Sequence, residues 1–306
     1  MQLKDFNAKV DTLFAKKGIL PGKKKQVVIK AFYEHFLAQA WLWHTFHGDG
    51  EKMLDILLDD SQLLGSAQFN KNFYGDILEQ PSLLTNKTWQ GLKTSLITFK
   101  GERVGGGEFY FLFVIADWKF QKDGGTSDGY VAGGKREIKF GGASLKPIAN
   151  SAHRVIDNLV ATVFEGNRPG PAKETKKTNG QSFSRWLAWF DTKSDKEQVL
   201  LDFFTPLYLG QDVTGMCKEL LTARTCKDFY YIIGKTVLKW YKDIEGFDSI
   251  TIIDIEKMKM ANIADVNNLE FFKTLKFDVA TKRGSNKGSS SGDVRQLADG
   301  YVNASI

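Results

Sequence analysis

The chain has 306 residues, of which 42% are hydrophobic and 25% are charged, as is usual for globular proteins. A formal net charge of +6 favours anionic partners without identifying one. The longest apolar run, FYFLFVIA at 109–116, falls short of the ~20 residues that a membrane-spanning helix needs. The first residues lack the apolar stretch of a signal peptide. We therefore expect a soluble protein with no membrane partner.

Two cysteines occur, Cys217 and Cys226. Their spacing matches neither a zinc site nor a disulfide framework. We expect reduced thiols, as in a cytoplasmic compartment.

Residues 1–95 are expected to form an N-terminal helical block. Apolar residues recur every three or four positions over 26–46, without an internal glycine or proline, which predicts one long buried helix. A second amphipathic helix is predicted over 51–67.

The pattern changes from about residue 96. Three glycines precede Glu108 and the apolar run 109–116. The run alone fits a buried strand or a buried helix, but an acid directly after the glycines favours a helix start, where the helix dipole stabilises it. Next, DGYVA and KREIKF flank Gly133-Gly134, a pattern typical of a β-hairpin over about 128–140.

The remaining chain also contains both predicted helices and predicted strands. Helices are predicted over 150–164 and within 182–242, and β-branched residues over 248–264 predict a strand pair in the same sheet as the hairpin. The predicted fold class is α/β (α+β): a small mixed sheet flanked by helices. We expect a core domain over 96–280, a helical insertion at about 182–242, and a flexible Gly/Ser-rich tail over 281–306.

The hairpin concentrates unusual charges. Glu137 and Lys139 are two apart on one strand and must share a face, and Asp128 on the preceding strand can lie near Glu137. Two close carboxylates repel unless a cation neutralises them, and Mg²⁺ is the usual choice for oxygen ligands. A metal and an amine together suit the hydrolysis of a phosphodiester.

This segment resembles the active-site core of the PD-(D/E)xK, or restriction-endonuclease-like, nuclease superfamily. In that family an acid on the second strand precedes a Glu/Asp-x-Lys triplet on the third, and Asp128 and Glu137-Ile138-Lys139 take those places. Glu108 matches the acid that many members carry on the first core helix. The family core is a helix, three strands, a helix and a strand. The resemblance covers about 100–165 and 246–265, and departs from the family name at Ser127, where proline is usual.

The resemblance implies residue roles. Glu108, Asp128, Glu137 and the backbone carbonyl of Ile138 would hold Mg²⁺, with Mn²⁺ able to substitute. Lys139 would position the attacking water or stabilise the transition state. Basic and aromatic residues outside the core would hold the DNA duplex. Separately, Lys146, Lys173, Lys176 and Lys177 are candidates for contacts with the phosphate backbone.

Simpler explanations exist for each residue. Asp128 fits an ordinary turn, Glu137 and Lys139 fit an exposed charge pair, and the helix dipole alone explains Glu108. The candidate DNA-binding lysines also fit solvated loops.

Two functions follow from these patterns. The first is a divalent-metal-dependent endonuclease acting on duplex DNA, in a prokaryotic or phage-infected cytoplasm, where cutting both strands would favour a homodimer. The second is a phage virion structural or assembly protein that reuses a nuclease-like fold, with or without residual nuclease activity. Metal binding at Asp128 and Glu137 favours the first, and a large apolar surface on the helical blocks favours the second.

Overall fold

The structure is a computed structural model, and its chain divides into two compact units. Unit 1 comprises Met1–Gly141 and Gly246–Asp265, and unit 2 comprises Gly142–Glu245 and Val266–Ile306. The structure describes residues 1–19, 27–99, 106–120, 129–131, 134–140, 143–145, 155–167, 169, 183–208, 210–254, 256–268, 276–279 and 302–305.

Unit 1 is built on a six-stranded mixed sheet with the strand order β1-β7-β6-β4-β3-β2. Strands β4 and β6 run parallel, and the other neighbouring pairs run antiparallel. In chain order the strands are β1 (Phe73–Asp76), β2 (Lys119–Phe120), β3 (Gly129–Val131), β4 (Gly134–Phe140), β6 (Ser249–Asp254) and β7 (Lys259–Ile263). The predicted mixed sheet is thus confirmed, and the hairpin and the 248–264 strand pair share it.

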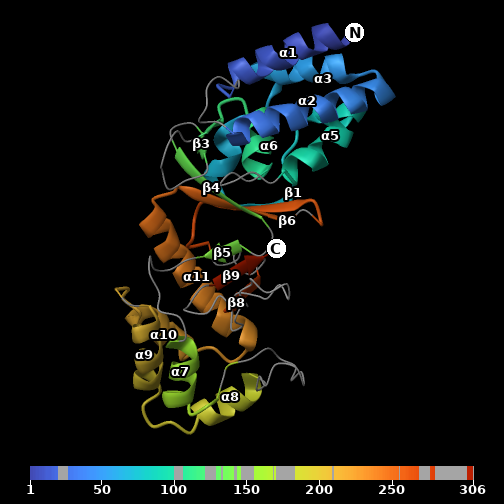
Figure 1. The fold of residues 1–306 in the computed structure, drawn as a ribbon. Coiled ribbons are helices and arrows are strands. Elements are labelled where there is room, and N and C mark those ends of the chain that lie inside the picture. Colours follow the sequence, from blue (N-terminus) through green and yellow to red (C-terminus); the bar gives the residue numbers. More distant parts are fainter. Residues whose placement is uncertain are drawn as a thin grey trace. The chain divides into compact units, whose positions relative to one another are not determined.

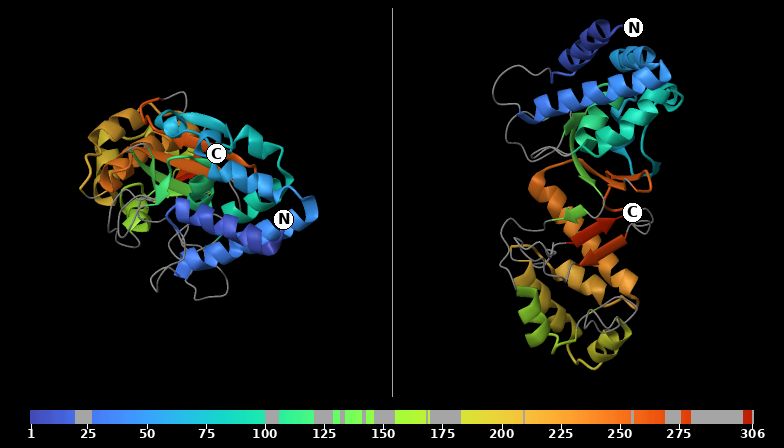
Figure 2. Two further views of the ribbon diagram at one scale, coloured as in Figure 1. Left: turned by 90° about the horizontal axis from the view of Figure 1, so that it is seen from above. Right: turned by 45° about the vertical axis from the view of Figure 1, so that its right-hand side comes forward.

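Helices cover one face of this sheet (Figure 1). The α-helices are α1 (Leu3–Lys16), α2 (Val27–His47), α3 (Gly50–Leu58), α4 (Pro81–Leu84), α5 (Lys87–Ile97) and α6 (Gly106–Val114), and the short 3-10 turns are η1 (Asp60–Gln62) and η2 (Ser66–Asn70). The two views of Figure 2 show α2 running across this helical layer. The long helix predicted over 26–46 is confirmed as α2.

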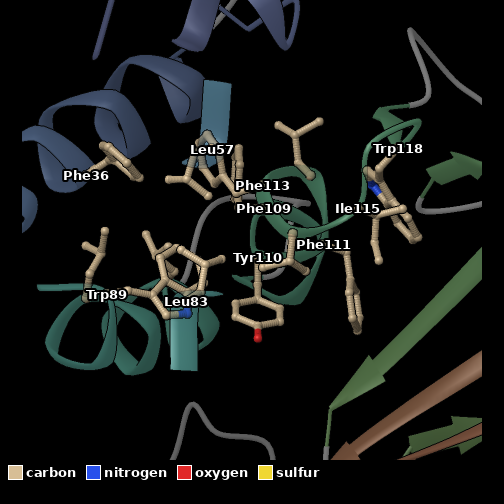
Figure 3. Packing of buried hydrophobic residues seen from close by; sticks show 14 of the residues in the cluster. Phe36, Leu57, Leu83, Trp89, Phe109, Tyr110, Phe111, Phe113, Ile115 and Trp118 are labelled. Atoms are coloured by element: carbon tan, nitrogen blue, oxygen red, sulfur yellow. The ribbon is translucent and has the colours of Figure 1, made fainter. Parts of the chain in front are cut away.

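Helix α6 is the centre of the unit 1 core. Every side chain from Phe109 to Ile115 is at most 1% exposed, because the helix is surrounded by other elements. Figure 3 shows Phe113 facing Phe36 of α2, and Tyr110 facing Trp89 of α5. The Phe109 ring stacks on Phe32 with 3.7 Å between centroids. The apolar run after the three glycines is therefore a buried helix, as the helix-start signal predicted.

Three local predictions need correction. The block 1–95 is not entirely helical, because β1 pairs with β7 at the edge of the sheet. The helix predicted over 51–67 ends at Leu58, where Asp59 turns the chain and accepts hydrogen bonds from the Ser61 backbone N–H and hydroxyl. The hairpin turn lies one residue earlier than predicted, since Gly134 already pairs with Val131.

Unit 2 combines helices with a three-stranded antiparallel sheet of order β5-β9-β8. Its strands are β5 (Ala143–Leu145), β8 (Lys276–Val279) and β9 (Val302–Ser305), and its helices are α7 (Val155–Thr162), α8 (Phe183–Phe190), α9 (Lys196–Leu207), α10 (Thr214–Leu220) and α11 (Cys226–Glu245). The helical prediction for 182–242 is confirmed by α8 to α11. The end of the predicted flexible tail forms strand β9, so the prediction is wrong for those residues.

The domain boundaries near residues 95 and 280 stay predictions, although helices α1 to α5 and the six-stranded sheet belong to one compact unit. Within the described ranges, no helix combines the length and the apolar character that crossing a membrane requires.

Candidate functional site

Strand β4 presents different residues to the two faces of the sheet. Alternation places Glu137 and Lys139 on one face and Arg136 and Ile138 on the other. Ile138 is 5% exposed and belongs to the unit 1 core. On the neighbouring strand β6, Ile250 pairs with Glu137 and Ile252 pairs with Lys139. The acid and the amine therefore share their face with isoleucines.

Glu137 is a buried carboxylate, with 3% of its surface exposed. The ammonium group of Lys139 forms an ion pair with it, and the lysine side chain remains 28% exposed. An ionised carboxylate loses several kcal/mol of hydration when it is buried, so a compensating cation is required. The alternative of an exposed charge pair is wrong for Glu137, although Lys139 does reach solvent.

Glu108 lies in the first turn of α6 and is 8% exposed. The sequence suggested either a functional acid or a residue held only by the helix dipole. The helix dipole stabilises an acid at this position whether or not it is buried. The dipole therefore does not explain why the Glu108 carboxylate is buried. Helix α6 contacts β4, the strand that carries Glu137.

The structure brings only part of the predicted set together. Glu137 and Lys139 are in direct contact, whereas the side chain of Ile138 points into the core. Asp128 lies outside the described residues, as does Ser127. The same holds for all four candidate DNA-binding lysines: Lys146, Lys173, Lys176 and Lys177. In the part of the chain that is described, no three His, Cys, Asp or Glu residues gather as a metal site.

The sequence reasoning missed Arg136, the neighbour of Glu137. Its side chain is 3% exposed and faces the helical layer of unit 1. Nη2 of Arg136 donates a hydrogen bond of 2.5 Å to Oδ1 of Asn70 in η2. Strand alternation could have predicted this burial, because Arg136 and Ile138 are two residues apart and therefore lie on the same apolar face.

The comparisons with known proteins give no relative: no family model, no curated protein and no solved structure matches the chain.

Proposed function

We propose that the protein is a Mg²⁺-dependent DNA endonuclease whose active site lies on β4. The observation that carries the proposal is the burial of Glu137 beside Lys139 on the isoleucine face of a central strand. An acid in such a place costs stability, and a functional role accounts for its presence better than packing does. The resemblance of this strand to the PD-(D/E)xK nucleases supplies the reaction type.

The order of elements supports this assignment. Helix α6 carries Glu108 and is followed by β2, β3 and β4, and then, after β5 and helices α7 to α11, by β6. This matches the helix, three strands, helix and strand that the nuclease resemblance implies, with β5 and four further helices inserted before β6. Asp128 lies outside the described residues and is included because it directly precedes β3 (Gly129–Val131) in the sequence, where the resemblance implies an acid.

The residues present fit a hard divalent cation. Glu108 and Glu137 both offer buried carboxylate oxygens, and oxygen ligands are those that Mg²⁺ prefers. In the proposed site these two acids and Asp128 hold the ion, with the carbonyl of Ile138 as a further ligand. The bound ion would supply Lewis acidity toward a phosphate oxygen.

The chain's own residues contribute orientation and charge. Lys139 sits beside Glu137 with part of its side chain in solvent, so its ammonium group is able to reach a phosphate or orient a water. The buried strand face excludes bulk water from the acid, which strengthens its interaction with cations.

Incubation of the full chain with supercoiled plasmid tests the function. We expect nicked and then linear plasmid in Mg²⁺ or Mn²⁺, and intact plasmid when EDTA is added. An intact plasmid with every divalent metal would overturn the proposal. Replacing plasmid by single-stranded DNA or RNA then defines the substrate class.

A second candidate function is an assembly protein of a phage virion, and one observation favours it. Leu42 and Phe46 are one turn apart on α2 and are 44% and 72% exposed, next to the half-buried Trp43. Such neighbours are typical of protein-contact surfaces. If the protein is an assembly component, a Leu42→Ser/Phe46→Ser variant should lose self-association in sedimentation experiments. An unchanged, monomeric profile for both forms removes this support.

A further inference from the structure

A row of buried polar side chains crosses the six-stranded sheet on its helix-covered face, opposite to Glu137. Trp118, Arg136 and Ser249 are 2%, 3% and 0% exposed. Among the described residues, four buried atoms of this region have no hydrogen-bond partner: Asp117 Oδ1, Trp118 Nε1, Arg136 Nε and Ser249 Oγ. Buried polar groups in native proteins are nearly always paired, so these four atoms need an explanation.

The strand register shows that the side chains adjoin one another. Arg136 pairs with Ser249 of β6 on one side and with Gly129 of β3 on the other, and paired residues on one face are about 5 Å apart at Cβ. Trp118 covers Gly129, since a Cβ at that glycine would stand 2.9 Å from Trp118 Nε1. Figure 3 shows the Trp118 indole beside Ile115, just after α6.

Other contacts fix the same side chains. The guanidinium of Arg136 lies over Gly134, where a Cβ would be 2.8 Å from Nη2, and Nη2 itself bonds to Asn70. Ser66 Oγ donates to Asp117 Oδ2 at 2.7 Å, which leaves Oδ1 as the free acceptor. Burial lowers the pKa of Arg136 from its ordinary value, while Asp248 and Asp117 raise it. These contacts leave the Asp117, Trp118 and Arg136 side chains little freedom to find partners by rotation.

The chemistry of the four atoms selects one kind of ligand. Trp118 Nε1 and Arg136 Nε are pure donors, the Asp117 oxygen is a pure acceptor, and the Ser249 hydroxyl does both. An anion would be repelled by the carboxylate of Asp117, and a cation would be repelled by the guanidinium of Arg136. Water both donates and accepts, and buried waters typically make about three such bonds.

We propose that this row is an internal hydration site, in which ordered water bridges Asp117, Trp118, Arg136 and Ser249. The alternative is four buried polar atoms without partners, each of which would lose its hydrogen bonds to water without replacement on folding. The water joins β4 and β6 to the segment after α6, and thereby supports the strand that carries Glu137 from the opposite face of the sheet.

Nuclear magnetic resonance on the full chain tests the proposal directly. We expect a cross-peak between a bound water and the indole N–H of Trp118, which the Trp118→Phe variant assigns by its loss. The indole N–H of Trp89 is the matched control, because it donates to Glu79 and should show no such water contact. A crystal structure that instead finds an ion at this place, or a partner from the chain itself, overturns the proposal.

The sign of a stability change gives a second test. If water pairs with Ser249, the Ser249→Ala variant loses a hydrogen bond and should melt at a lower temperature. If the hydroxyl is unpaired in a dry site, its removal should leave the melting temperature unchanged or raise it. Either result would contradict the proposal. Thr251→Val is the control, since the Thr251 hydroxyl has a protein partner at 2.9 Å, Asn262 Oδ1, and its loss should lower the melting temperature in either case.

Discussion

Lys139 forms an ion pair with Glu137, two residues before it on β4, while Ile138 between them enters the core of unit 1. Strand alternation explains the arrangement, because residues at i and i+2 share a face. The core thus fixes the strand through Ile138 and thereby presents the acid and the amine together. A shift of one residue in register would exchange the two faces.

The pair predicts an unequal effect of removing each partner. Lys139→Met should lower the free energy of unfolding by about 1–3 kcal/mol, because it removes a cation from a buried carboxylate. Glu137→Gln should cost less, since a neutral amide needs no cation. Urea unfolding of the two variants measures the difference. A smaller loss for Lys139→Met than for Glu137→Gln would contradict the account of Glu137 as a buried anion.

Helix packing in unit 1 depends on a glycine of α5. A Cβ at Gly91 would stand 2.2 Å from Cδ2 of Trp43 on α2, so the indole and the helix cannot both keep their places. We expect Gly91→Ala to destabilise the protein by about 1–3 kcal/mol, the usual cost of overpacking. Gly65→Ala is the control, because that glycine has nothing within 4 Å and an ordinary φ of −78°. Equal melting temperatures for the two variants would contradict this prediction, because they would show that Trp43 moves aside without a loss of stability.

Asp49 links the start of α5 to the loop before α3, and it predicts a pH dependence. Its carboxylate accepts hydrogen bonds from the backbone N–H groups of Lys87 at 2.8 Å and Thr88 at 3.0 Å. Burial raises the pKa of Asp49, but the hydrogen bonds from Thr88 and Lys87 outweigh it and hold the pKa below its ordinary value.

A lowered pKa in the folded state stabilises the protein at pH values above the unfolded pKa of about 4, and this contribution is lost as the pH falls through the folded pKa. We expect Asp49→Asn to cost about 0.3–1 kcal/mol at pH 7, the usual value of a negative charge at a helix N-terminus. The difference between variant and wild type should shrink below pH 4. A difference that stays constant from pH 7 to pH 3 would contradict the role of the charged form.

Local patterns were sufficient to predict much of the fold. The apolar residues of α2, which is 21 residues long, recur every three or four positions, and four of the six residues of β6 are β-branched. Both signals are carried by neighbouring residues, so no knowledge of tertiary contacts was needed. The same holds for the face shared by Glu137 and Lys139, which follows from alternation alone.

Features that depend on distant contacts were missed. Strand β1 is four residues long and exists because β7 pairs with it, with Phe73 opposite Asn262. The hydrogen-bond partner of Arg136 likewise could not be predicted, because Asn70 lies far away in sequence. The depth at which Glu137 is buried could not be predicted either, since it depends on what covers the sheet. Asp128 and the candidate DNA-binding lysines stay predictions.

The rate of plasmid nicking by Glu137→Gln, relative to wild type, tests the proposed active site most directly. Asp76→Asn is the matched control: the acid lies on β1 at the edge of the same sheet, with 85% of its side chain exposed. The account predicts a loss on the order of 100-fold or more for Glu137→Gln, as when a group that stabilises the transition state is removed, and a wild-type rate for Asp76→Asn. Nicking by Glu137→Gln at the wild-type rate would contradict the account, because the nuclease activity would then reside elsewhere.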